Sequence, residues 1–268
     1  MEQVDSIKTN DFLMASNVHR ELGQGSLSKL VADGFPHHPF HSLRLNKYQL
    51  EDIMSEYLAM SSSFPYLQAG SCSKQIIDSI TGDRPIRPEV ELTSVVGAFL
   101  VWDEFGGWLK TVKAGAKGLP GILDTSAFHA NVLKSDLSSI FGKEIMPRFG
   151  LSTKKYLLDL YRGLSDTDDL RRCAMMTSFE FHAERMIKEL WSSLKDSTGC
   201  GDEELRYFVG HVGGDDPAEA YHVQMTEKMM ATLVGSNVRG FKRAFLECYG
   251  LHFNWCHSIV NQVGSKEV

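Results

Sequence analysis

Apolar residues recur every three or four positions along almost the whole chain, and no run alternates apolar and polar residues between hairpin turns. Residues with this spacing lie on one face of an α-helix, whereas a half-buried strand needs a period of two. Because an amphipathic helix must bury its apolar face against another element, the pattern predicts an all-α bundle. The sequence has no repeat and no long linker, so we expect one domain over residues 1–268.

Segments rich in glycine and proline separate the predicted helices. The helices cover residues 10–32, 46–60, 91–113, 127–141, 152–163, 167–194, 202–212, 217–234 and 236–262. Two prolines in the segment 35–41 predict a loop, and the stretch SSSFPYL at 61–67 predicts a break before the helix resumes. The centre of the helix at 91–113 is apolar on all sides, so we expect it to be buried.

Composition and charge argue against several classes of function. The formal net charge of −6 and the lack of a basic run disfavour nucleic acid as a partner. No apolar stretch reaches the roughly 18 residues that a membrane-spanning helix needs, and the N-terminus lacks the pattern of a signal peptide. The five cysteines form no C-x-x-C pair, which favours reduced thiols in the cytoplasm over disulfides or a zinc site.

Carboxylates on an apolar helix face are costly unless they are paired or bind a metal. Asp103 and Glu104 directly follow an apolar run that ends at Trp102, so we expect at least one of them to point into the core. The alternative is that both side chains leave the buried part of the helix, which Gly106 and Gly107 would allow.

A second pair of carboxylates lies on the helix predicted at 167–194. At about 100° per residue, Glu180 falls in the middle of the apolar stripe and Glu184 falls on its edge. His182 falls on the polar side, so we expect it at the surface. A structural salt bridge is the alternative explanation for the two glutamates.

The stretch HVGGDDPAEAYH at 211–222 combines histidines with aspartates and a glutamate. His222 shares a face with core-facing methionines of the helix that follows, and Glu219 lies one turn before it. If the helical period is extended backwards along the chain, His211 and Asp215 also fall on the face that carries His222. The alternatives are a helix-capping role for Glu219 and a buried structural role for His222.

His129 lies near the apolar stripe of the helix predicted at 127–141, where a structural histidine would also fit. With the residues above, it completes a set of imidazoles and carboxylates on the inward faces of four helices. Histidine and carboxylate ligands without cysteine are typical of iron or manganese sites with open coordination positions. The sequence therefore predicts a metal centre inside the bundle.

Several short motifs, taken in order, are similar to those of a known group of proteins. They are His38-Pro-Phe, Ser63-Phe-Pro, Phe99-Leu-Val-Trp-Asp, Phe128-His, Ala183-Glu-Arg-Met-Ile and Tyr207-Phe-x-x-His. The chain resembles the haem-oxygenase-like non-haem diiron oxidases and oxygenases, which are related in fold to thiaminase II and pyrroloquinoline quinone synthase. The resemblance covers most of the chain and implies a haem-oxygenase-like helical bundle.

In that family two irons are held by a histidine, a bridging glutamate, an earlier glutamate and a His-x-x-x-Asp-x-x-His helix. By this resemblance His129 matches the first histidine and Glu184 matches the bridging glutamate. His211 and Asp215 match the first half of the late motif, whereas Ala218 stands in the place of its second histidine.

The late motif can also be read one turn further along the chain. Asp215, Glu219 and His222 then keep the spacing of the motif, with carboxylates in its first two places. The glycines and the proline inside this stretch leave open whether His211 or Asp215 is the ligand that precedes them.

For the earlier carboxylate the resemblance favours Glu104, with Asp103 and Asp124 as alternatives. The complete set of implied metal ligands is Glu104, His129, Glu184, His211, Asp215, Glu219 and His222. Whether the metal is iron or manganese, and whether one or two ions bind, is open at this point.

The resemblance implies an O2-dependent oxidoreductase with Fe(II)/Fe(III), two per chain. The family acts largely on amino acids and fatty acids, by N-oxygenation, oxidative C–C cleavage or desaturation. We therefore expect a small amino-acid-derived or fatty-acid substrate in a natural-product pathway. An external electron donor and a homodimer are left open. The alternatives are a metal-independent enzyme related to thiaminase II, and a non-catalytic protein that binds a metal or a small ligand.

Overall fold

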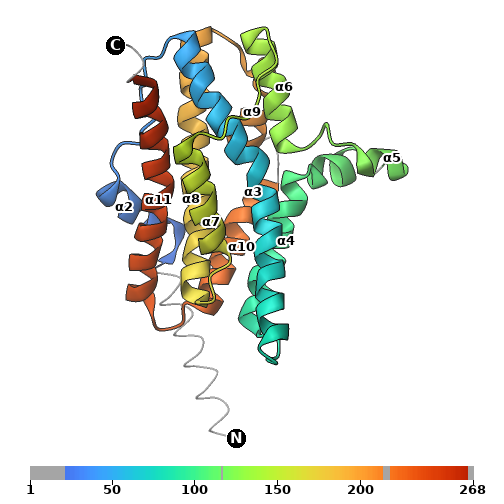
Figure 1. The fold of residues 1–268 in the computed structure, drawn as a ribbon, viewed down its shortest axis with the longest axis vertical. Helices are drawn as coiled ribbons and strands as arrows, with labels where there is room; N and C mark the ends of the chain where they lie inside the picture. The colour runs from blue at the N-terminus through green and yellow to red at the C-terminus, as the bar shows by residue number, and fades with distance from the viewer. Residues whose placement is uncertain (1–21, 116, 214–217, 265–268) are drawn as a thin grey trace, which may run out of the picture.

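The structure is a computed structural model that describes residues 22–115, 117–213 and 218–264, apart from the side chains of Gln24, Glu219 and Ala220. No strand occurs in these residues, which confirms the prediction of an all-α bundle (Figure 1). The elements in chain order are α2 (Gln24–Gly34), α3 (Lys47–Thr81), α4 (Pro88–Glu104), the π-helix η1 (Trp108–Lys113), α5 (Gly118–Leu123), α6 (His129–Phe141), α7 (Leu151–Leu164), α8 (Asp169–Thr198), the 3₁₀ turn η2 (Asp202–Glu204), α9 (Arg206–Val212), α10 (Ala218–Leu233) and α11 (Val238–Gly264). None of the helices in the described residues is long and apolar enough to cross a membrane.

The long helix α8 packs against α7, α9, α10 and α11 and forms the centre of the bundle. Helix α3 runs beside α7 and also contacts α4, α6 and α11 (Figure 1). Side chains such as Leu160, Leu190 and Phe245 are buried between these helices. Each side chain of this kind stabilises the fold by roughly 1.5–3 kcal/mol relative to full exposure. This core is the rigid frame on which the polar side chains described below are mounted.

Helix α3 runs without interruption through Pro65, so the predicted break at 61–67 is wrong. A proline cannot donate the helical hydrogen bond to the carbonyl of Ser61. Packing offsets this loss, because Phe64 and Pro65 are both buried. The ring of Phe64 stacks on that of Phe179 in α8, with centroids 4.0 Å apart.

Helix α4 ends at Glu104, although the sequence predicts a helix over 91–113. Gly106 has a φ of +71°, and a Cβ atom there would lie 2.3 Å from the carbonyl oxygen of Ala127. Only glycine fits this turn, because other residues disfavour positive φ and have no room here. The chain then continues as η1 and α5, which extend sideways from the bundle (Figure 1). Val95 is 61% exposed, so the expected burial on all sides is also wrong.

The prolines of segment 35–41 predict a loop, and the structure has a loop there, between α2 and α3. This loop lies against α8. The guanidinium of Arg185 donates hydrogen bonds to the carbonyl oxygens of Phe35 and Pro36, at 2.7 and 2.9 Å. His38 follows in this loop and is buried. The loop therefore covers one side of α8 and is tied to it.

The predicted helices at 152–163, 167–194 and 236–262 correspond to α7, α8 and α11 and differ from them by a few residues at the ends. The predicted helix at 10–32 lies mostly outside the described residues, and α2 begins at Gln24. Helix ends are the least determined part of an apolar pattern, because capping and packing decide the last turn.

Candidate metal centre

Glu104, His129 and His211 meet where three helices end. Glu104 is the last residue of α4, His129 is the first residue of α6, and His211 lies in the last turn of α9. Nδ1 of His129 lies 3.6 Å from Oε2 of Glu104, and the rings of His129 and His211 have centroids 4.6 Å apart. One donor atom from each residue lies within 4.8 Å of the other two, so one ion could contact all three.

The protonation states of this cluster suit a metal ion. Burial raises the pKa of Glu104, but the imidazoles of His129, His211 and His222 outweigh burial, and the pKa is lowered from its usual value. Burial, helped by His129, lowers the pKa of His211 to about 4. At neutral pH Glu104 is therefore ionised and His211 is neutral, which are the forms that bind metals.

The backbone of α9 orients the ring of His211. Its Nδ1 donates a hydrogen bond to the carbonyl oxygen of Tyr207, 2.8 Å away, so Nε2 is the nitrogen that would bind a metal. The ring of Tyr207 lies against that of His211, with centroids 4.1 Å apart. The hydroxyls of Tyr207 and Tyr57 are 2.7 Å apart, which links this group to α3.

A second polar group lies beside the first, because Asp103 precedes Glu104 in the chain. Oδ2 of Asp103 lies 3.1 Å from Nε2 of His222 in α10. The other ring nitrogen of His222, Nδ1, lies 3.4 Å from Oε2 of Glu180 in α8. His222 therefore stands between two carboxylates that come from different helices.

The carboxylate of Asp103 is fully buried, yet neither of its oxygens accepts a hydrogen bond from a described residue. A carboxylate in such a place is costly unless a positive charge compensates it. A protonated His222 would supply that charge, and so would a metal ion held by the far nitrogen of His222. In the second case Asp103 fixes the orientation of the ring.

A pocket of about 710 Å³ adjoins both groups. Its polar lining includes Glu104, Glu180, His211 and His222. Its apolar lining includes Phe64, Leu100, Phe179, Ile187 and Trp191. A small molecule in this pocket would contact the polar donors while apolar side chains surround the rest of it.

Two of the carboxylates considered from the sequence are not brought into the cluster. Glu184 lines the same pocket but is exposed, and no hydrogen bond or ion pair joins it to the described residues of the cluster. Glu180, one turn earlier, is the glutamate of α8 that approaches His222. Helical periodicity favours Glu180, whereas motif matching favours Glu184. Asp124 is exposed and accepts hydrogen bonds from the amide and hydroxyl of Ser126.

The structure describes only part of the late motif at residues 211–222. His211 and His222, on either side of residues 214–217, both line the pocket. Asp215 lies outside the described residues, and Glu219 lies in α10 but its side chain is not described. The two histidines thus reach one site from separate helices, α9 and α10.

The prediction that His182 lies at the surface is wrong, since only 2% of this residue is exposed. Its Nε2 lies 3.2 Å from Nε2 of His38 and 3.9 Å from Sγ of Cys256. The side of α8 that carries His182 is covered by the loop before α3 and by α11. The pattern within α8 cannot reveal this cover, because both covering segments are distant in the sequence.

Comparison with known proteins supports the fold and names no activity. No model of a protein family matches the chain, and no curated protein matches it. The structure is similar to the crystal structure of a CADD-like protein of unknown function from Nostoc punctiforme PCC 73102. The TM-score is 0.60 at 12% sequence identity, over 97% of this chain and 98% of that one. At this identity the likeness shows a shared all-helical fold.

Proposed function

We propose that this protein is a non-haem diiron oxidoreductase that uses O2 and acts on a small substrate. The observation that carries the proposal is the meeting of Glu104, His129 and His211 next to Glu180 and His222 at one pocket. Two imidazoles and one carboxylate around one position are the donor set of many iron sites that keep coordination positions open.

The chemistry of the side chains fits iron. Carboxylate oxygens and imidazole nitrogens are suitable ligands for Fe(II) and Fe(III), and the first cluster contains no sulfur donor among the described residues. The buried carboxylate of Asp103, which accepts no hydrogen bond from a described residue, fits the positive charge of a metal bound nearby. These features also fit manganese, which the experiment below distinguishes.

Each residue has a separate role in this proposal. Glu104, His129 and His211 would hold one iron, and Glu180 and His222 would contribute to the second. Oδ2 of Asp103 lies 3.1 Å from Nε2 of His222, where an outer carboxylate would orient the ring once a metal binds on its other side. When bound, the iron pair would supply the electrons that reduce O2 and the oxidising power that acts on the substrate.

Other residues of the pocket orient a metal ligand, bind the substrate and exclude water. The carbonyl of Tyr207 keeps the ring of His211 in one tautomer and one orientation. Apolar side chains such as Phe179 and Trp191 exclude water and bind the apolar part of a substrate. By the resemblance noted in the sequence, this substrate is a small amino-acid-derived or fatty-acid molecule. The fold likeness to a CADD-like protein supports an all-helical bundle, the architecture that the resemblance implies.

The test is an anaerobic titration of the metal-free protein with Fe(II), followed by rapid mixing with O2 and optical monitoring. The proposal expects about two irons per chain and a transient visible absorption band. A parallel titration with Mn(II) shows which metal binds more tightly. Screening of amino acids and fatty acids as substrates then follows with the iron-loaded protein.

Other results would assign a different function. Iron uptake without any reaction with O2 would indicate a non-catalytic metal-binding protein. Absence of iron uptake would contradict the proposal and favour a metal-independent enzyme related to thiaminase II. A nucleophilic cysteine is disfavoured at Cys173, because burial raises the pKa of its thiol to about 12.

A further inference from the structure

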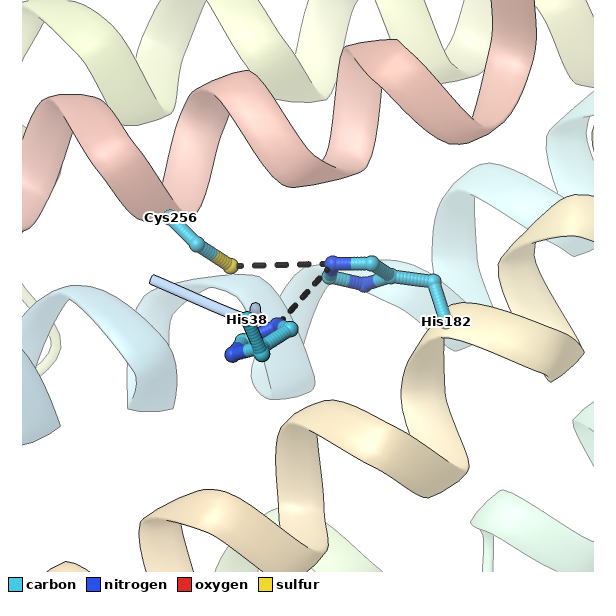
Figure 2. A group of neighbouring side chains, drawn as sticks. All are labelled: His38, His182 and Cys256. Atoms are coloured by element: carbon cyan, nitrogen blue, oxygen red, sulfur yellow. Dashed lines mark hydrogen bonds between the residues drawn. The ribbon is translucent and has the colours of Figure 1, made fainter. Parts of the chain in front are cut away.

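A second group of metal-binding side chains lies on another face of α8, and none of its three members lines the pocket. His38 comes from the loop before α3, His182 from α8 and Cys256 from α11 (Figure 2). All three residues are buried. His182 is two residues from Glu180, so helical geometry turns their side chains to nearly opposite sides of α8.

The separations between the donor atoms match those around a tetrahedral metal ion. With metal–nitrogen bonds of about 2.1 Å and metal–sulfur bonds of about 2.3 Å, two nitrogens lie about 3.4 Å apart and nitrogen and sulfur about 3.6 Å apart. Nε2 of His38 lies 3.2 Å from Nε2 of His182, and the latter lies 3.9 Å from Sγ of Cys256. Figure 2 shows the ring of His38 and the thiol of Cys256 both directed toward the ring of His182.

A fourth soft donor lies next to the three. Sδ of Met186, one helical turn after His182, lies 3.7 Å from Sγ of Cys256. Two sulfurs bound to one tetrahedral ion lie about 3.8 Å apart. A set of two imidazoles, a thiolate and a thioether selects thiophilic metals and differs in kind from the oxygen-rich pocket cluster.

We propose that His38, His182 and Cys256, with Met186 as a weaker fourth ligand, bind one thiophilic transition-metal ion of the class of Zn²⁺ and Cu⁺. This site is separate from the centre at the pocket, and the inference does not depend on the proposed oxidase function. The ion would join the loop before α3 to α8 and α11, and so add a link to the one that Arg185 already makes.

In the metal-free protein, hydrogen bonds connect His38 to His182 and to the backbone of Phe40. The amide of Phe40 donates to Nδ1 of His38, 3.1 Å away, so Nε2 of His38 carries the proton and donates it to Nε2 of His182. Metal binding releases one proton, that of the Cys256 thiol, to solvent. His38 keeps its proton but moves it from Nε2 to Nδ1, and the amide of Phe40 gives up its bond there. The hydrogen bond between His38 and His182 is lost as well, because both Nε2 atoms then bind the metal. Several metal–ligand bonds outweigh these two lost hydrogen bonds.

Two exposed histidines lie in the same loop as the buried His38. His37 and His41 flank His38 in the loop and are exposed, and their rings stack with centroids 6.0 Å apart. Imidazoles at the surface can capture an ion before it passes to the buried donors. The loop must open for this transfer, so binding is expected to be slower than at an exposed site.

The test uses Co²⁺ as a spectroscopic probe on the reduced, metal-free full-length protein. A thiolate bound to Co²⁺ produces a near-ultraviolet charge-transfer band, and a tetrahedral site also produces intense visible bands. The pocket cluster cannot produce the charge-transfer band, because its described donors are oxygen and nitrogen. The titration is carried to equilibrium beyond the amount of Co²⁺ that the pocket centre binds. We expect both features to reach the intensity of one Co²⁺ bound at this site per chain, and we expect Zn²⁺ or Cu⁺ to remove them by displacement.

Matched variants assign the band to its ligand. Cys256→Ser should abolish the charge-transfer band, whereas Cys173→Ser, at another buried cysteine of the core, should retain it. His129→Ala should also retain it, because His129 belongs to the pocket cluster. If Cys256→Ser fails to fold, His38→Gln in the loop serves instead and should weaken Co²⁺ binding about tenfold or more. A wild-type protein without the band, or a folded Cys256→Ser protein with it, would overturn the proposal.

Discussion

Nδ1 of His129 and Oε2 of Glu104 lie 3.6 Å apart, and this contact joins the start of α6 to the end of α4. The side chains are only 13% and 16% exposed. Between them in the chain lies the arm of η1 and α5, which leaves the bundle at Gly106 and returns before Phe128. The geometry of the candidate metal centre therefore depends on a turn at one glycine as well as on the ligands themselves.

Glu104→Gln removes the negative charge beside His129 and keeps the size of the side chain. We expect iron affinity to fall about tenfold or more, because an amide is a poor ligand for iron, while the helical content stays unchanged. Anaerobic calorimetric titration measures the affinity, and circular dichroism measures the helical content. Glu144→Gln is the control, because that carboxylate is exposed and pairs with Lys134. Equal iron affinity in the two variants would remove Glu104 from the ligand set.

Glu180→Gln and Glu184→Gln form a matched pair on one helix. The geometry favours Glu180, whose Oε2 lies 3.4 Å from Nδ1 of His222, over the exposed Glu184. We expect Glu180→Gln to lower the iron content of the purified protein and Glu184→Gln to leave it unchanged. Metal analysis by mass spectrometry distinguishes the two. The reverse result would support the assignment of Glu184 as the bridging ligand, which motif matching favours.

Gly106→Ala should destabilise the protein and disturb the metal centre together. The new Cβ would lie 2.3 Å from the carbonyl oxygen of Ala127, in a residue with φ of +71°. Gly115→Ala is the control, because Gly115 has φ of +68° but nothing within 4 Å of the added atom. Backbone strain alone costs about 1 kcal/mol, so any greater loss at position 106 measures the steric clash. Urea unfolding and iron titration of both variants separate the two effects, and equal losses would contradict this account.

Acid should destabilise the metal-free protein through its buried histidines. Burial lowers the pKa of His252 from 6.5 to about 3, and the ring accepts a hydrogen bond from Tyr156 and donates one to Ser178. Above pH 6.5 His252 is neutral in both the folded and the unfolded chain. As the pH falls below this value, the unfolded chain takes up a proton that the folded chain does not. Folding stability therefore decreases by up to about 1.4 kcal/mol per pH unit for this group.

His252→Asn tests this linkage. The variant should lose stability at neutral pH, because its hydrogen bonds change, but its unfolding free energy should depend less steeply on pH. Urea unfolding at several pH values between about 7 and 4 gives the two slopes. Identical slopes in the variant and the original protein would show that His252 titrates normally in the folded state.

The bundle and most of the metal-centre candidates could be predicted from the sequence, because both depend on local periodicity. Apolar residues at helical spacing determine which segments become helices and which face of each is buried. A carboxylate or imidazole on such a face is visible without a structure, as Glu104, His129 and His222 illustrate. The turn at Gly106 was not predicted, because the helix was expected to continue to residue 113.

Features that depend on which elements meet were decided only by the tertiary structure. Pro65 continues a helix because Phe64 finds an aromatic partner in α8, and no local rule for proline contains that contact. His182 lies on a polar stripe of α8 that the loop before α3 and α11 cover. The sequence by itself determined the helices and their apolar faces, since these follow from the spacing of neighbouring residues. The structure decided which polar side chains those faces bring together, because these contacts join residues far apart in the chain.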